Sequence, residues 1–166
     1  MDPVPIREAS GAHDLALARE LFEEYARWLG VDLCFQGFAG ELATLPGRYA
    51  PPRGRLLLAG APGRASGCVA LRPLDPPPAV FAAAAPVGEV KRLYVRPDAR
   101  GTGTGGALAR AIVDAARAIG YRTLCLDTLE RMREARSLYR RLGFAPSPPY
   151  YDNPLPDVEY YSLALR

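Results

Sequence analysis

The chain has 166 residues, of which 49% are hydrophobic and 23% charged, a composition typical of one globular domain rather than of a disordered chain. Its 21 basic and 18 acidic residues leave a net charge of +3, too small an excess to predict a nucleic-acid partner. The three cysteines lie far apart and there is one histidine, so the sequence predicts neither a disulfide framework nor a metal site.

The first residues show no basic segment followed by a hydrophobic one, so no secretory signal is expected. The longest apolar run, at 79–87, is far shorter than the roughly 20 residues that span a bilayer. Together with the sparse cysteines, these features predict a cytoplasmic protein with no membrane partner.

In the N-terminal half, apolar residues first recur at helical spacing and then form two short runs around a turn. Gly60-Ala61-Pro62-Gly63 separates these runs, a pattern typical of a β-hairpin. We expect a strand at 4–8, helices at 15–29 and 38–45, and hairpin strands at 55–59 and 68–72.

The C-terminal half follows a proline-rich loop at 74–86 and alternates strands with helices. We expect strands at 88–95, 123–127 and 159–165, and helices at 108–119 and 135–142. The complete order is β-α-α-β-β-β-α-β-α-β. The hairpin requires antiparallel pairing and the later strand-helix-strand unit favours a parallel crossover. The sequence therefore predicts a single α/β domain over 1–166 with a mixed sheet.

A glycine-rich turn, Gly101 to Gly106, connects the strand at 88–95 with the next helix. Glycine adopts positive φ without strain and lets a ligand approach the backbone closely. The first N–H groups of a helix lack internal partners, and the helix dipole adds about half a positive charge there. The turn therefore predicts a diphosphate site, whereas the alternative is that the glycines only end a strand and begin a helix.

Three nucleotide-site patterns compete for this turn. A P-loop needs a lysine after the last glycine, and none is present. Gly101-x-Gly103-x-x-Gly106 matches a dinucleotide-binding pattern, but the N-terminal half lacks the repeated βαβ units of such a domain. Arg100-x-x-Gly103-x-Gly105 resembles the acyl-coenzyme A signature of the GNAT superfamily of N-acetyltransferases.

A second motif strengthens this resemblance. Ala135-x-x-Leu138-Tyr139-x-x-Leu142-Gly143-Phe144 is similar to the second signature of the superfamily, at a typical distance downstream. A narrower resemblance to uncharacterised bacterial members includes the segments 35–38, 45–49, 126–129 and 150–154. One departure is Met132, because many relatives carry a cofactor-contacting asparagine at that position.

The resemblance implies an enzyme that transfers an acetyl group from acetyl-CoA, its cosubstrate, to an amine of a small molecule or peptide by direct attack, without a metal. It implies that the main chain at 93–95 holds the pantetheine arm and that a backbone N–H near Tyr94 stabilises the oxyanion. The cofactor-binding residues that it implies are Leu93, Tyr94, Val95, Arg100, Gly101, Thr102, Gly103, Thr104, Gly105 and Gly106.

Two catalytic roles follow from the resemblance. Tyr139 is the candidate general acid for the departing thiolate, and the alternative is a core tyrosine on the helix face of Ala135 and Leu142. Glu89 is the candidate general base, and the alternatives are a surface salt bridge with Lys91 or Arg92 and a base acting through water.

The sequence identifies neither the acyl acceptor nor the oligomeric state. Aromatic residues that either line an acceptor pocket or pack in the core are Phe35, Phe38, Tyr49, Tyr150 and Tyr151. A homodimer is common among relatives. The competing function from another class is a non-catalytic module of the same fold that binds acyl-CoA as a sensor, and a nucleotide-dependent oxidoreductase is a distant third.

Overall fold

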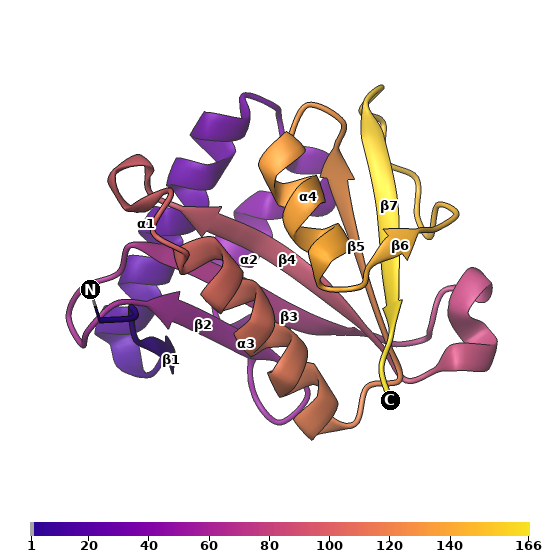
Figure 1. Cartoon of the computed structure of the whole chain (residues 1–166), viewed down its shortest axis with the longest axis horizontal. Coiled ribbons are helices and arrows are strands. Elements are labelled where there is room, and N and C mark those ends of the chain that lie inside the picture. Colours follow the sequence, from indigo (N-terminus) through magenta and orange to yellow (C-terminus); the bar gives the residue numbers. More distant parts are fainter. Residues whose placement is uncertain (1) are drawn as a thin grey trace.

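A seven-stranded mixed sheet organises the computed structural model, which describes residues 2–166 (Figure 1). The spatial order of its strands is β1-β2-β3-β4-β5-β7-β6. In chain order the elements are β1 (Ile6–Glu8), α1 (Gly11–Leu29), α2 (Phe38–Thr44), β2 (Arg55–Ala59), β3 (Gly67–Leu74), β4 (Val87–Val95), α3 (Thr104–Ile119), β5 (Thr123–Leu129), α4 (Arg133–Arg141), β6 (Ala145–Pro146) and β7 (Val158–Ala164).

The predicted order of strands and helices is confirmed, but several boundaries differ, among them the start of α1, which lies at Gly11 and not at residue 15. Helix α3 begins at Thr104, because Gly103 takes a left-handed conformation and serves as its N-cap. The proline-rich loop contains a 3-10 helix at Ala79–Ala84. The two-residue strand β6 was not predicted, because a pair containing a proline gives no strand pattern.

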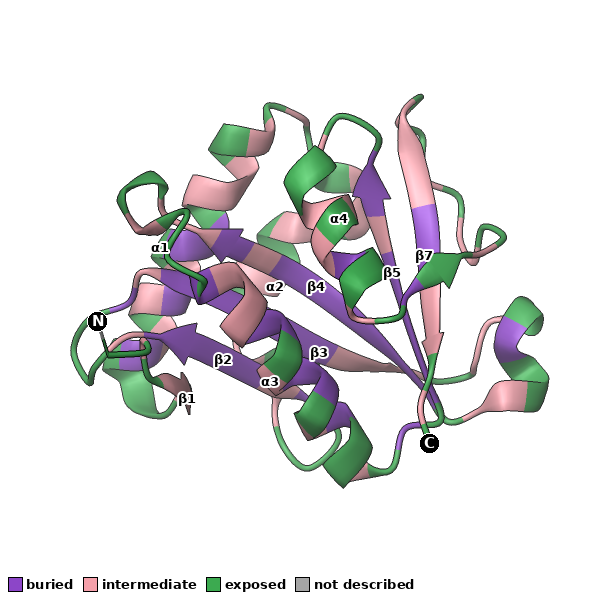
Figure 2. Cartoon of the chain, in the orientation of Figure 1, coloured by how far each residue is buried: buried purple, intermediate pink, exposed green. Residues whose placement is uncertain are grey.

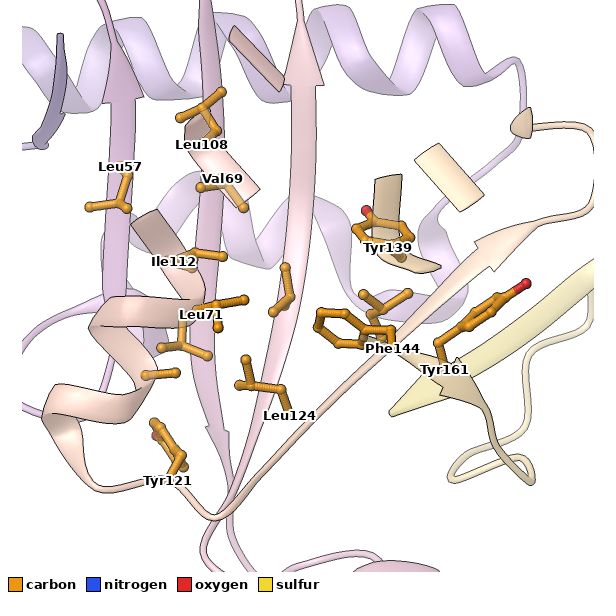
Figure 3. Close-up of a cluster of buried hydrophobic side chains, with 14 of the residues drawn as sticks. Leu57, Val69, Leu71, Leu108, Ile112, Tyr121, Leu124, Tyr139, Phe144 and Tyr161 are labelled. Atoms are coloured by element: carbon orange, nitrogen blue, oxygen red, sulfur yellow. The ribbon is translucent and has the colours of Figure 1, made fainter. Parts of the chain in front are cut away.

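Helices cover both faces of the sheet. On one face, α3 and α4 close a core cluster in which α3 contributes Leu108, Ile112, Val113 and Ala116, spaced to form one apolar helix face (Figure 3). On the other face, Ala18, Leu21 and Phe22 of α1 pack on β2 and β3. The central strands are accordingly buried while the outer helix faces are exposed (Figure 2). Among the described residues, no helix is long and apolar enough to cross a membrane.

The single parallel pairing, between β4 and β5, is short. It joins Val87–Glu89 of β4 to Thr123–Cys125 of β5, and no pairing follows although both strands continue. Beyond Glu89 the two strands run apart toward the end of β4 (Figure 1). The sheet is therefore open in its middle, and β4 has an unpaired edge that faces β5.

A β-bulge lies in this unpaired part of β4. Cys68 of β3 pairs with Tyr94 and Ala70 pairs with Lys91, so two residues of β4 oppose Val69 alone. One of the two, Arg92, has a φ of +60° and is the one described non-glycine residue with positive φ. The bulge places two consecutive residues, Lys91 and Arg92, in the lining of one small cavity beside β4.

We predict that Gly67 is required for the close pairing of β3 with β4. A Cβ atom at this position would lie 2.7 Å from the main-chain oxygen of Tyr94, which cannot move without disturbing the strand. Gly67→Ala should therefore lower the free energy of unfolding by about 1–3 kcal/mol.

Gly40→Ala is the matched control, because a Cβ at Gly40 of α2 has no atom within 4 Å. It should raise the free energy of unfolding by about 0.5–1 kcal/mol, since alanine loses less backbone entropy than glycine in a helix. Denaturant titration of both variants tests this pair, and equal effects would contradict the steric argument.

Candidate active site

The glycine-rich turn presents main-chain N–H groups at the start of α3. Gly101 and Gly103 have φ values of +76° and +86°, which side-chain-bearing residues rarely adopt. The Thr102 hydroxyl donates a 2.6 Å hydrogen bond to the Ala99 carbonyl and lies 2.8 Å from the hydroxyl of Thr104. These contacts fix the turn while leaving the first N–H groups of α3 without helical partners.

A cleft of about 910 Å³ opens between this turn, the end of β4 and helix α4. All of the predicted cofactor-binding residues except Thr102 line it. Arginine side chains from three segments also line it, at Arg100, Arg110, Arg131, Arg133 and Arg141. The cleft thus combines free main-chain donors with several cations, which is what the phosphate groups of a coenzyme A molecule require.

Arg100 lies against an aromatic surface at the cleft. Its guanidinium lies 4.9 Å from the centroid of the Trp28 ring and 5.8 Å from that of Tyr94. Its Nε donates a 2.9 Å hydrogen bond to the Val95 carbonyl. Sequence reasoning missed Trp28 as a site residue, because its spacing assigned it only to a helix face, whereas the structure leaves it 49% exposed in the lining of the cleft.

Tyr139 lies where the cleft meets a second, smaller cavity. This cavity of about 40 Å³ is lined by Tyr139 together with Leu93 and Met132, which also line the cleft. The Tyr139 ring packs edge-on against Phe144 at 5.7 Å and its hydroxyl points away from that ring (Figure 3). Burial raises the pKa of Tyr139, so the phenol is protonated at neutral pH.

The smaller cavity is polar on its β5 side. The Asp127 carboxylate accepts hydrogen bonds from the Tyr151 hydroxyl and, at 2.8 Å, from Asn153 Nδ2. Lys91 Nζ lies 3.6 Å from Asp127 Oδ1. Burial opposes the charge of Asp127, but Lys91 and the two hydrogen bonds outweigh it and hold the pKa of this carboxyl below its usual value.

Glu89, unlike Tyr139, is buried without lining the smaller cavity. Its carboxylate is 1% exposed and forms ion pairs with Lys91 at 3.1 Å and Arg72 at 3.2 Å. Among the described residues that line the cleft and the smaller cavity, Glu89 is absent, whereas its partner Lys91 lines the cavity. The alternative salt bridge with Lys91 thus forms, but it is buried and not at the surface as expected, while Arg92 pairs with Glu41 at 2.8 Å instead.

The aromatic residues that were candidates for either an acceptor pocket or the core lie outside the lining of the smaller cavity. The Phe38 ring lies 5.2 Å from the Arg92 guanidinium, and Tyr49 donates a 2.7 Å hydrogen bond to Glu41. Tyr150 packs against Phe81, and Tyr151 bonds to Asp127. Within the described chain, the residues that line the cavity include none of the five predicted aromatics.

Sequence reasoning also missed the polar cavity residues Gln36, Lys91, Asp127 and Asn153 as a group. They come from four segments, and only the fold brings them together. Among residues 2–166, no group of three or more histidine, cysteine, aspartate or glutamate side chains is arranged to hold a metal ion.

Known proteins resemble this chain over nearly its whole length. It is 39% identical over 153 residues to an uncharacterized N-acetyltransferase of Schizosaccharomyces pombe, covering 92% of this chain and 89% of that protein. It is 35% identical to an IAA acetyltransferase of Azospirillum brasilense, covering 93% and 95% of the two chains. The resemblance therefore extends beyond bacterial members.

Solved structures share the fold. A GNAT-family acetyltransferase of Staphylococcus aureus superposes with a TM-score of 0.75 at 17% identity, covering 98% of this chain and 99% of that one. The protein yncA of Salmonella typhimurium, solved with its cofactor acetyl-CoA, superposes with a TM-score of 0.69 at 19% identity, covering 99% and 95%. The family model described as acetyltransferase (GNAT) family matches residues 16–144, and this chain belongs to that family.

Proposed function

We propose that the protein transfers the acetyl group of acetyl-CoA to a primary amine of a small molecule or peptide by direct attack. The observation that carries this proposal is the junction of the cleft with the smaller cavity at Leu93 and Met132, which line both, with Tyr139 in the lining of the smaller cavity. A thioester that reached this junction from the cleft would meet an amine that entered from the cavity.

Main-chain groups would hold most of the cosubstrate. The N–H groups of the turn at 101–106 would bind the diphosphate, with Arg100 and its neighbours adding charge. Because β4 has no β5 partner after Glu89, its edge at 93–95 is available to pair with the amide groups of the pantetheine arm. A backbone N–H near Tyr94 would stabilise the oxyanion.

The chemical step forms a bond between the amine nitrogen and the carbonyl carbon and breaks the carbon–sulfur bond. Tyr139 would donate its phenolic proton to the departing thiolate. A phenol is protonated at neutral pH even at its ordinary pKa, and burial, which raises the pKa of Tyr139, makes it a weaker acid, so the transfer depends on the basicity of the thiolate. The amine must lose a proton to a base. Glu89 would serve this role through an intervening group, because its carboxylate does not line the cavity whereas its ion-pair partner Lys91 does.

The proposed function predicts that the protein binds coenzyme A. Coenzyme A or acetyl-CoA should raise the melting temperature, since a ligand at 100 times its dissociation constant stabilises by about 2.7 kcal/mol. Gly105→Val should abolish this shift because the added methyl groups would enter the cleft, whereas the Cβ itself lies 3.7 Å from Val95 Cγ2 and fits the fold.

Gly40→Val is the matched control for that variant, because Gly40 lies in α2 and outside the cleft. This control should retain the full shift in thermal denaturation. A full shift in Gly105→Val would remove the diphosphate assignment.

Tyr139→Phe separates an enzyme from a binding module. Loss of the general acid should lower kcat about 10²–10⁴-fold without weakening acetyl-CoA binding, because the proton is needed only as the thiolate leaves. The measurement is acetyl-CoA-dependent release of free thiol with a panel of amines.

Tyr121→Phe is the control for Tyr139→Phe, since it removes a buried hydroxyl that donates to the Arg53 carbonyl away from the site. It should cost about 1 kcal/mol of stability and no activity. A Tyr139→Phe enzyme as fast as wild type would reject the acid role. A wild type that transfers to no amine would favour the acyl-CoA sensor.

Glu89→Gln tests whether Glu89 is the general base. Without a base, attack depends on amine that is already deprotonated, so the deficit in kcat should be largest at low pH and shrink as pH rises. Arg72→Gln is the control, because it removes an ion-pair partner of Glu89 and keeps the carboxylate. A pH–rate profile of Glu89→Gln that matches wild type would leave Glu89 with only its ion pairs.

A further inference from the structure

The charged side chains that line the smaller cavity differ in how closely they are paired. Arg92 is held by Glu41 at 2.8 Å and by Gln36 at 2.8 Å. Lys91 lies closer to Glu89, at 3.1 Å, than to Asp127, at 3.6 Å. Both cations that line the cavity thus have a close partner outside its lining. Among the described lining residues, Asp127 carries the one carboxylate, and its ion pair with Lys91, at 3.6 Å, is longer than the contact of that cation with Glu89.

The two oxygens of Asp127 differ in their partners. Oδ2 accepts the hydrogen bonds from Tyr151 and Asn153. Among residues 2–166, no hydrogen-bond donor reaches Oδ1, whose neighbour is Lys91 Nζ at 3.6 Å. A carboxylate oxygen has room for two hydrogen bonds, so Oδ1 has accepting capacity left beside a cavity that adjoins Tyr139.

We propose that Asp127 Oδ1 binds the amine head of the acceptor, and that the acceptor is a primary amine on an unbranched carbon without an adjacent carboxylate. This inference rests on the proposed acetyl transfer. It names the residue that recognises the acceptor and the chemical class that the cavity admits.

The size of the cavity limits what the amine can carry. At about 40 Å³ the cavity is far smaller than the cleft of about 910 Å³, so it favours an amine on an unbranched carbon over one with a branch beside the nitrogen. The remaining wall contains Leu29, Leu33 and Leu155, which suit an alkyl stem.

The charge pattern excludes an α-amino acid. A carboxylate on the carbon that bears the amine would need a free cation beside the cavity. Lys91 and Arg92 are both engaged by carboxylates of the protein, so neither supplies one without losing a buried ion pair. An amine without a neighbouring anion needs only an accepting oxygen, which Asp127 supplies.

The test uses Asp127→Asn and three amines of equal carbon number: butylamine, sec-butylamine and 2-aminobutyrate. Isothermal titration calorimetry measures their binding to protein saturated with coenzyme A. An asparagine at 127 can accept the bonds from Tyr151 and Asn153 with its carbonyl oxygen, which leaves its NH₂ group facing the cavity. Asp127→Asn should therefore weaken butylamine binding about 10–100-fold, the effect of losing one charge-assisted hydrogen bond.

Asp114→Asn is the control, because Asp114 is an exposed α3 carboxylate paired with Arg117, and its loss changes the net charge equally. It should bind butylamine as wild type does. On wild type, butylamine should bind more tightly than sec-butylamine or 2-aminobutyrate, a comparison that holds even if Asp127→Asn fails to fold.

Three results would overturn the inference: butylamine binding unchanged in Asp127→Asn, a preference for either competing amine, or no amine binding to wild type. Thiol release from acetyl-CoA, measured separately, tests the proposed function. Asp127-dependent butylamine binding without thiol release from any amine would uphold the amine site and refute acetyl transfer.

Discussion

The buried ion pair between Arg92 and Glu41 holds the irregularity on which the site depends. Arg92 has a left-handed backbone, which costs about 1–2 kcal/mol for a residue with a side chain. Its guanidinium bonds to Glu41 at 2.8 and 3.2 Å and to Gln36 at 2.8 Å, and it is covered by Phe38. Burial opposes this charge, but Glu41 outweighs it and raises the pKa of Arg92. The strand is therefore fastened at its bulge to α2 and to the turn before it.

The bulge and the short parallel pairing together produce both cavities. Beyond Glu89, β5 no longer pairs with β4, and the free edge of β4 becomes the wall along which a long ligand can lie. Leu93, the second residue of the bulge, and Val95 pack with the core beneath α3, while Lys91 and Arg92 line the smaller cavity. The bulge therefore lies between the end of β4, which lines the cleft, and Lys91, which lines the smaller polar cavity.

The sequence was sufficient to predict the parts of the site that lie in continuous segments. The turn at 101–106 and the helix of Tyr139 carry motifs whose residues are close in the chain, and the structure places both at the cleft. The polar cavity could not be predicted, because Gln36, Asp127 and Asn153 meet only after the sheet forms. The bulge at Arg92 was also invisible, since its conformation is stabilised by Glu41, 51 residues away.

Glu89 shows a further limit of motif reasoning. Its position in the strand matches a site where some relatives place a catalytic glutamate. The groups that contact its carboxylate, however, are side chains of β3 and of β4 itself. Arg72 and Lys91 surround the carboxylate with positive charge, and Cys125 lies opposite it on β5. A motif identifies the residue type at a position, whereas its electrostatic partners depend on register.

The central claim is that the opening between β4 and β5 binds acetyl-CoA and directs its thioester to Tyr139. A crystal structure of the protein with coenzyme A measures this directly. We predict that the diphosphate accepts hydrogen bonds from main-chain N–H groups at 101–106, that the pantetheine arm pairs with 93–95, and that the sulfur lies next to the Tyr139 hydroxyl. Coenzyme A bound elsewhere, or β4 and β5 paired beyond Glu89 in the complex, would contradict the account.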